Sequence, residues 1–173
     1  MKAIVGAYCA AVLIQPPVFA VIAMVLLAIS LLGGATTGDG DVLRMLSGLA
    51  QMSIFVVLVA AVVVAVLGIP LFLAIKRSGN LNWRSILLAG FLAAAIPYAL
   101  LAFPLWRDSS GFSYGENWHG TYRALVVDGV YTIYGWLNYL EAIVRFGIQG
   151  WSGAAAFYFV WLKTHEPQQR APL

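Results

Sequence analysis

Charged residues are scarce in this chain of 173 residues: Asp, Glu, Lys and Arg make up 10% of it, against 62% for hydrophobic residues. A soluble domain carries about 25% charged residues. One core of this size cannot hide so much apolar surface, so the sequence predicts a chain solvated by lipid. The net charge of +3 is small. Its basic residues form no stripe interleaved with aromatics, which argues against nucleic-acid binding.

Cysteine and histidine are nearly absent, with one Cys and two His. Cys9 alone can form neither an intramolecular disulfide nor a thiolate metal cluster. The sequence contains no P-loop, dinucleotide fingerprint, haem-type His pair or acidic Mg²⁺ cluster, so we expect no cofactor, no metal and no enzymatic activity. Glu116 and His119, in GENWHG, offer fewer ligands than a zinc site wants. A membrane enzyme that uses Glu116 and His119 is the weakest of three functional hypotheses.

Four apolar segments, at about 3–32, 49–75, 85–105 and 143–162, predict an all-α polytopic membrane protein whose single membrane domain spans 1–173. The first segment continues past a weak cleavage-like site, so we expect an uncleaved span. As a straight helix it would be about 45 Å long, against about 30 Å of hydrocarbon. Gln15-Pro16-Pro17 therefore predicts either one kinked helix, which we favour, or two helices. Gly68 and Pro70 predict a bend in the second segment.

The basic residues predict the topology. Lys76, Arg77 and Arg84 flank the tight turn between the second and third segments. Cytoplasmic loops carry an excess of Lys and Arg, so this turn and both termini are expected in the cytoplasm. The expected location is a bacterial inner membrane, in which the protein is multi-pass.

The long connection 106–142 lies on the opposite, outer side in this topology. Its first part is rich in Gly, Ser and aromatics and predicts an irregular loop. Apolar residues within 121–141 recur at helical spacing, which predicts an amphipathic helix on the outer membrane face. In the alternative interpretation, 124–150 is the fourth span and 151–162 an extension, at the cost of placing several polar residues at membrane depth.

Two features mark the last segment. Glu141 and Arg145 form an i, i+4 pair, interpreted either as an intramembrane gate or as an interfacial pair with Arg145 extended toward lipid phosphates. Gly147, Gly150 and Gly153 belong to a small-residue patch that lets helices approach closely, within the chain or between copies.

The runs VLGIPLFLAIKRSGNLNWRSILLAGFLAAAIP (66–97) and GWSGAAAFYFVWL (150–162) resemble small, mostly uncharacterised bacterial four-helix inner-membrane proteins. Some such proteins are immunity proteins against membrane-acting toxins, and others belong to membrane-embedded phage-defence complexes. The resemblance covers about a quarter of the chain and carries no catalytic residues.

The leading functional hypothesis is a non-enzymatic protein that recognises a protein partner through its outer region, as an immunity or defence protein would. The expected contact residues are Phe112, Tyr114, Trp118, His119 and Tyr122, since aromatic anchors dominate contact energetics. The second hypothesis is a subunit of a homo-oligomeric channel or transporter. A continuous polar path would favour the channel, and a dry bundle with a rigid outer cap would favour recognition.

Overall fold

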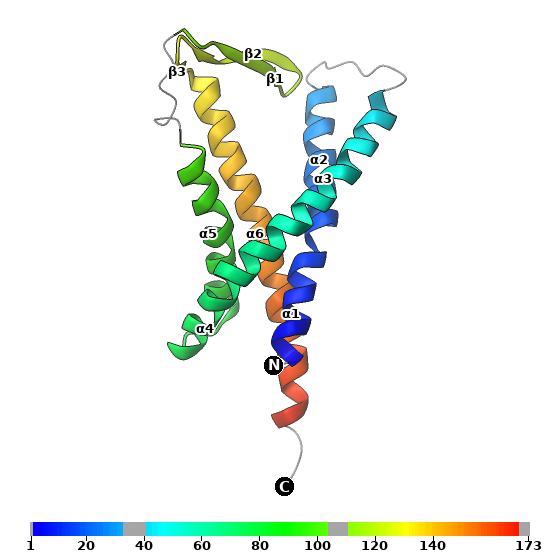
Figure 1. Ribbon diagram of the computed structural model, residues 1–173, viewed down its shortest axis with the longest axis vertical. Coiled ribbons are helices and arrows are strands. Elements are labelled where there is room, and N and C mark those ends of the chain that lie inside the picture. The colour runs from blue at the N-terminus through cyan, green and yellow to red at the C-terminus, as the bar shows by residue number, and fades with distance from the viewer. Residues whose placement is uncertain (1, 33–40, 104–110, 170–173) are drawn as a thin grey trace.

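Helices make up most of the chain, and a small sheet lies at one end of them. The structure is a computed structural model that describes residues 2–32, 41–103 and 111–169 (Figure 1). In chain order the elements are α1 (Lys2–Leu13), α2 (Gln15–Leu32), α3 (Asp41–Val63), the π-helix η1 (Val64–Gly68), α4 (Ile69–Arg77), α5 (Trp83–Leu101), β1 (Tyr114–Trp118), β2 (Thr121–Val127), β3 (Val130–Tyr131) and α6 (Ile133–Gln169).

The helices form two arms that diverge toward the sheet (Figure 1). One arm contains α2 and α3; the other contains α5 and the first half of α6. The start of α1, the end of α6 and the turn between α4 and α5 all lie at the end opposite the sheet. The start of α1 and the end of α6 thus lie at one end and the sheet at the other, which is the parity that the predicted topology requires.

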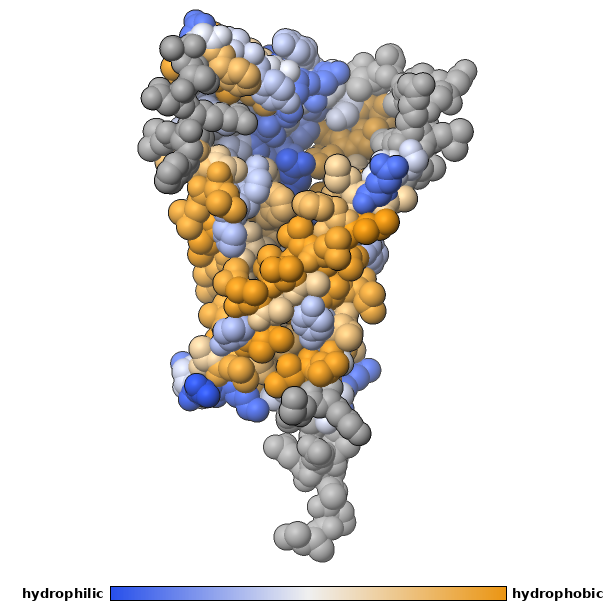
Figure 2. Space-filling model, viewed as in Figure 1, coloured by the Kyte–Doolittle hydropathy of each residue, from blue (hydrophilic) through white to orange (hydrophobic). Residues whose placement is uncertain are grey.

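Three described segments are long and apolar enough to cross a membrane: Ala3–Leu32, Ser47–Arg77 and Trp83–Leu101. They correspond to the first three predicted spans. Many of their large apolar side chains are exposed, among them Val21, Phe55 and Leu88. Figure 2 shows an apolar band around the middle of the visible face, with hydrophilic residues gathered toward both ends. Such a surface favours contact with lipid over contact with water.

The predicted fourth span, 143–162, lies inside the much longer helix α6, which has 37 residues. At 1.5 Å per residue, α6 is about 55 Å long. It runs from the sheet to the opposite end and contacts α1, α2 and α5 along the way (Figure 1). It is not among the segments that length and composition alone mark as membrane-crossing.

The first segment is a helix with a local break at Ile14. The ladder continues across the break, because Ile14 N donates to Ala10 O (3.1 Å) and Val18 N donates to Ile14 O (3.3 Å). Pro16 and Pro17 have no N–H to donate. The Gln15 side chain adds a bond, from Nε2 to Ala11 O at 3.0 Å. The geometry is that of one kinked helix.

The expected bend near Gly68 and Pro70 takes the form of η1. The N–H of Ile69 donates to Val64 O, five residues back, where an α-helix would reach only four. Pro70 cannot donate and its ring crowds the preceding turn, so a wider turn relieves the clash. This π-helix joins α3 to α4 without ending the helical course.

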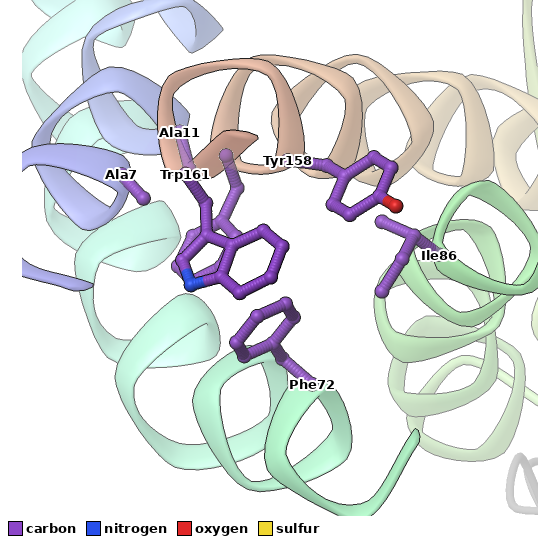
Figure 3. Packing of buried hydrophobic residues seen from close by; sticks show 7 residues of the cluster. Ala7, Ala11, Phe72, Ile86, Tyr158 and Trp161 are labelled. Carbon is purple, nitrogen blue, oxygen red and sulfur yellow. The ribbon is translucent and has the colours of Figure 1, made fainter. Parts of the chain in front are cut away.

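The buried core lies in the half of the molecule away from the sheet. Figure 3 shows Phe72 of α4 pointing toward Trp161 of α6, with Ala7 and Ala11 of α1 nearby. The Phe72 ring meets Phe157 and Trp161 edge-on, at centroid distances of 4.9 and 5.3 Å. Ile86 and Tyr158 complete this cluster, which is called here the aromatic cluster after its rings (Phe72, Phe157, Tyr158 and Trp161). It joins α1, α4, α5 and α6.

The prediction of an amphipathic helix over 121–141 is wrong for its first half, where residues 121–131 form strands. The alternative fourth span, 124–150, fails for the same reason. Two-residue loops connect the three antiparallel strands, and His119, Gly120, Asp128 and Gly129 in these loops all have positive φ, of 52°, 82°, 50° and 80°. Positive φ at both loop positions marks the type I′ turn, whose twist matches paired strands.

Candidate functional site

The three-stranded sheet, called here the outer hairpin (Tyr114–Tyr131), is fixed to the start of α6. Thr132 makes the joint: its N–H donates to Leu125 O (3.0 Å), and its hydroxyl donates to Ala124 O (2.7 Å). The same hydroxyl accepts from Gly135 N (3.2 Å), which is the bond of a helix N-cap. A Cβ on Gly135 would collide with Leu125 O. One threonine and one glycine thus couple the strands rigidly to the helix.

Glu141 is the centre of a polar cluster beneath the hairpin. Its Oε2 accepts from Trp118 Nε1 at 2.8 Å and lies 3.0 Å from His119 Nε2. Its Oε1 lies 3.8 Å from Arg145 Nε, too far for a hydrogen bond but close enough for an ion pair. The Glu141 side chain is only 23% exposed. The Glu141 carboxylate therefore links Trp118 and His119, at the first turn of the hairpin, to Arg145, which lies one helical turn further along α6.

The side chains of Glu116 and His119 have different hydrogen-bond partners and do not converge on one site. The Glu116 carboxylate accepts from Asn138 Nδ2 (2.9 Å) and from the Tyr114 hydroxyl (2.7 Å), whereas His119 faces Glu141. The carboxylates of Glu116 and Glu141 thus both hold the hairpin against α6. Among the described residues, no group of three or more His, Cys, Asp or Glu is placed to hold a metal ion.

The five predicted contact residues divide into two groups. Phe112, Tyr114 and Tyr122 are exposed, to 44%, 44% and 71%. Trp118 and His119 are half-buried beside Glu141 on the inner side of the hairpin, with their ring centroids 4.4 Å apart and the rings tilted by 48°. The first group can meet a partner, and the second positions the hairpin.

Tyr122, although exposed, has a defined position. A Cβ on Gly115 would lie 2.6 Å from the Tyr122 hydroxyl, so the ring lies across the bare backbone of β1. Arg123, next in β2, places its guanidinium 4.5 Å from the Tyr134 ring on α6. The hairpin therefore presents an aromatic ring from a firmly held frame.

The predicted packing glycines all face another helix. A Cβ on Gly147 would meet the Phe91 ring, one on Gly150 would meet Gly90 O of α5, and one on Gly153 would lie 2.6 Å from Gln15 Nε2. The backbones of α5 and α6 thus cross in direct contact at Gly90 and Gly150. These contacts are within the chain.

The Glu141–Arg145 pair lies between the hairpin and this crossing point. Arg145 is five residues, or about 7.5 Å of helix, on the sheet side of Gly150. The aromatic contact of Phe146 with Tyr98, at 4.5 Å between centroids, puts this turn beside the last third of α5. Arg145 thus stands toward the sheet end of the helical bundle.

An apolar cavity of about 800 Å³ separates the two arms. Arg145 and Gln149 line it from α6, and Gln15 lines it from α2. Gln15 is 4% exposed and bonds Gln149 O across the gap, at 3.3 Å. The aromatic cluster closes the end away from the sheet. Arg145 and Gln15 each stand out in the sequence, but only the fold places them around one cavity.

No family model, curated protein or solved structure matches this chain.

Proposed function

We propose that this chain is an integral membrane protein with four spans, the fourth being the middle of α6. The exposed apolar band and three membrane-length helices support this proposal. Lys76 and Arg77 end α4 at the pole opposite the outer hairpin. By the positive-inside rule, that pole and the termini face the cytoplasm, and the hairpin faces outward.

We further propose that the protein is a non-enzymatic recognition protein whose outer hairpin binds a protein partner. The observation that carries this proposal is Tyr122, which is 71% exposed and yet held over Gly115 by the strand pairing. A rigid exposed aromatic ring loses little conformational entropy on binding, and tyrosine is enriched among residues that dominate interface energetics. Phe112 and Tyr114 are two further exposed aromatic residues at this end of the molecule. The partner that fits is a protein with an apolar pocket at the outer membrane surface.

Site-specific photo-crosslinking tests this proposal in native membranes. A photoreactive side chain replaces Tyr122 in the full chain, and in a matched control it replaces Thr121. Thr121 is also exposed and precedes Tyr122 on the same strand, and successive strand side chains point to opposite faces. One defined protein adduct is expected from position 122 and not from 121. No adduct at position 122, or equal adducts from both positions, would contradict the proposal.

The alternative is a subunit of an oligomeric channel, and one observation favours it. Glu141, Arg145 and Gln149 recur every four residues on α6 and make a polar stripe that continues below the hairpin. Against a pore through one chain stands the aromatic cluster, which closes the stripe's inner end. Planar-bilayer recording decides: ion conductance by the purified wild-type chain, abolished by Arg145→Ala, would favour the channel over recognition.

A further inference from the structure

The cavity between the arms has the size and chemistry of a ligand site. Its volume of about 800 Å³ is within the range of small-molecule pockets, about 300–1,000 Å³. Its walls are mostly apolar, with Ile22 and Ala23 of α2, Val59 of α3 and Ala93 of α5 among them. Figure 2 shows a hollow between the sheet end and the upper part of α3. An apolar site that opens on an apolar outer surface admits lipid more readily than a soluble ligand.

Arg145 is the unusual residue of this cavity. Its side chain is 38% exposed, and its guanidinium makes no hydrogen bond to any residue that the structure describes. Glu141 attracts it only from 3.8 Å, because the other oxygen of that carboxylate is engaged by Trp118 and His119. A guanidinium beside apolar walls is costly without a bonded anion. Its planar N–H groups match a phosphate group well.

Gln149 lies one turn deeper, about 6 Å along α6. Gln149 lines the cavity, and its side-chain amide makes no hydrogen bond to any described residue, although its backbone oxygen accepts from Gln15 and Ser152. Below it the lining is apolar down to Phe72 and Phe157, except for Gln15, whose amide is bonded to Ala11 O and Gln149 O. From the sheet end inward, the wall therefore offers a cation, then an amide, then hydrocarbon.

We propose that this cavity binds one glycerophospholipid from the surrounding bilayer. The order of groups on the wall matches the order along such a lipid: phosphate at Arg145, glycerol ester at Gln149, acyl chain against the apolar walls. A free phosphate ion would use only the first of these contacts. The proposal requires lipid access to the cavity and is independent of any partner at Tyr122.

Native mass spectrometry of the purified full-length chain tests the proposal, after detergent exchange that removes loosely bound lipid. The added probe is phosphatidylglycerol. Arg145→Gln removes the phosphate contact, and Ala23→Phe fills part of the cavity. The matched controls are Arg123→Gln, a cation on the outer hairpin, and Ala28→Phe, an exposed alanine of α2 outside the cavity lining. Circular dichroism and elution as one species establish that each variant is folded.

The wild-type chain is expected to retain one phospholipid per copy. Retention should fall about tenfold or more in Arg145→Gln and Ala23→Phe, partly recover in Arg145→Lys, and stay unchanged in both controls. Equal retention in wild type and Arg145→Gln would overturn the phosphate contact. Equal retention in Ala23→Phe would overturn the cavity as the site. Complete displacement of the lipid by inorganic phosphate would overturn the role of the acyl chain.

Discussion

The crossing of α5 and α6 gives a prediction whose sign is decided by geometry. Gly150→Ala adds a Cβ that would lie 2.6 Å from the Ala94 Cβ and closer still to Gly90 O. Gly90 O is a backbone atom inside a helix, so it cannot turn aside as a flexible side chain would. The two helices must therefore move apart at this crossing, which lies within the arm formed by α5 and the first half of α6.

The magnitude follows from two opposing effects. Overpacking a well-packed site costs about 1–3 kcal/mol, and replacing a helical glycine by alanine returns about 0.5–1 kcal/mol. The difference between these ranges is about 0–2.5 kcal/mol, so Gly150→Ala is expected to destabilise the fold by about 1 kcal/mol, near the middle of that range. Gly48→Ala is the control, because a Cβ at Gly48 of α3 meets nothing within 4 Å. It should be neutral or stabilising by about 0.5–1 kcal/mol.

The assay is unfolding of the purified chain in mixed micelles with increasing fraction of a denaturing detergent, followed by circular dichroism. The midpoint should fall for Gly150→Ala and stay level or rise for Gly48→Ala. A midpoint for Gly150→Ala equal to or above that of Gly48→Ala would refute the direct backbone contact between α5 and α6.

Three further predictions concern the attachment of the outer hairpin. Thr132→Val keeps the shape but loses the hydroxyl's bonds to Ala124 O, Leu125 O and Gly135 N, at about 1 kcal/mol each, so hydrogen exchange at the Gly135 amide should accelerate about tenfold or more; Thr132→Ser should stay near wild type, and equal exchange in both would refute the cap. Gly129→Val forces a β-branched residue to φ near 80°, so proteolysis within the hairpin should increase while the helical signal is kept; a resistant hairpin would contradict the turn assignment. Glu141→Gln keeps an acceptor for Trp118 but loses the charge that attracts Arg145, so the indole N–H resonance should shift modestly, whereas in Glu141→Ala it should move to a solvent-exposed position; an unmoved resonance in the alanine variant would contradict the bond.

Long apolar runs were the reliable part of the sequence. Segments such as VVLVAAVVVAVLGIPLFLAI have too few polar groups to be stable in water, and backbone hydrogen bonding in lipid leaves helix as the simplest solution. The break at Gln15-Pro16-Pro17 followed from the missing amide donors of proline. The cavity could not be predicted from these runs. Its wall combines residues of α2, α3, α5 and α6, and the apolar sequence of one helix does not specify its tilt relative to the others.

The outer hairpin was missed although its signal was present. Asp128-Gly129 between VV and VY is a strong local signature of a two-residue hairpin loop, and His119-Gly120 forms a second such loop. The apolar residues of 121–141 fit helical spacing although this range contains two strands and the start of α6. The residues that favour a tight turn decide the structure there, because Asp128 and Gly129, which have positive φ, interrupt the helical spacing.

The polar stripe on α6 explains why this helix looks least like a span. An isolated membrane helix with Glu141, Arg145 and Gln149 would expose three costly groups to hydrocarbon. Here α6 stands between α1, α2 and α5, the hairpin engages Glu141, and Gln15 engages the backbone of Gln149. Its neighbours thus reduce the cost of the polar groups, so under the proposed four-span topology the hydropathy of α6 taken alone underestimates how well α6 fits the membrane. In the proposed topology, Arg145 is the member of the stripe whose charged group has no hydrogen bond to the described residues. A lipid phosphate bound at Arg145 would supply that hydrogen bond.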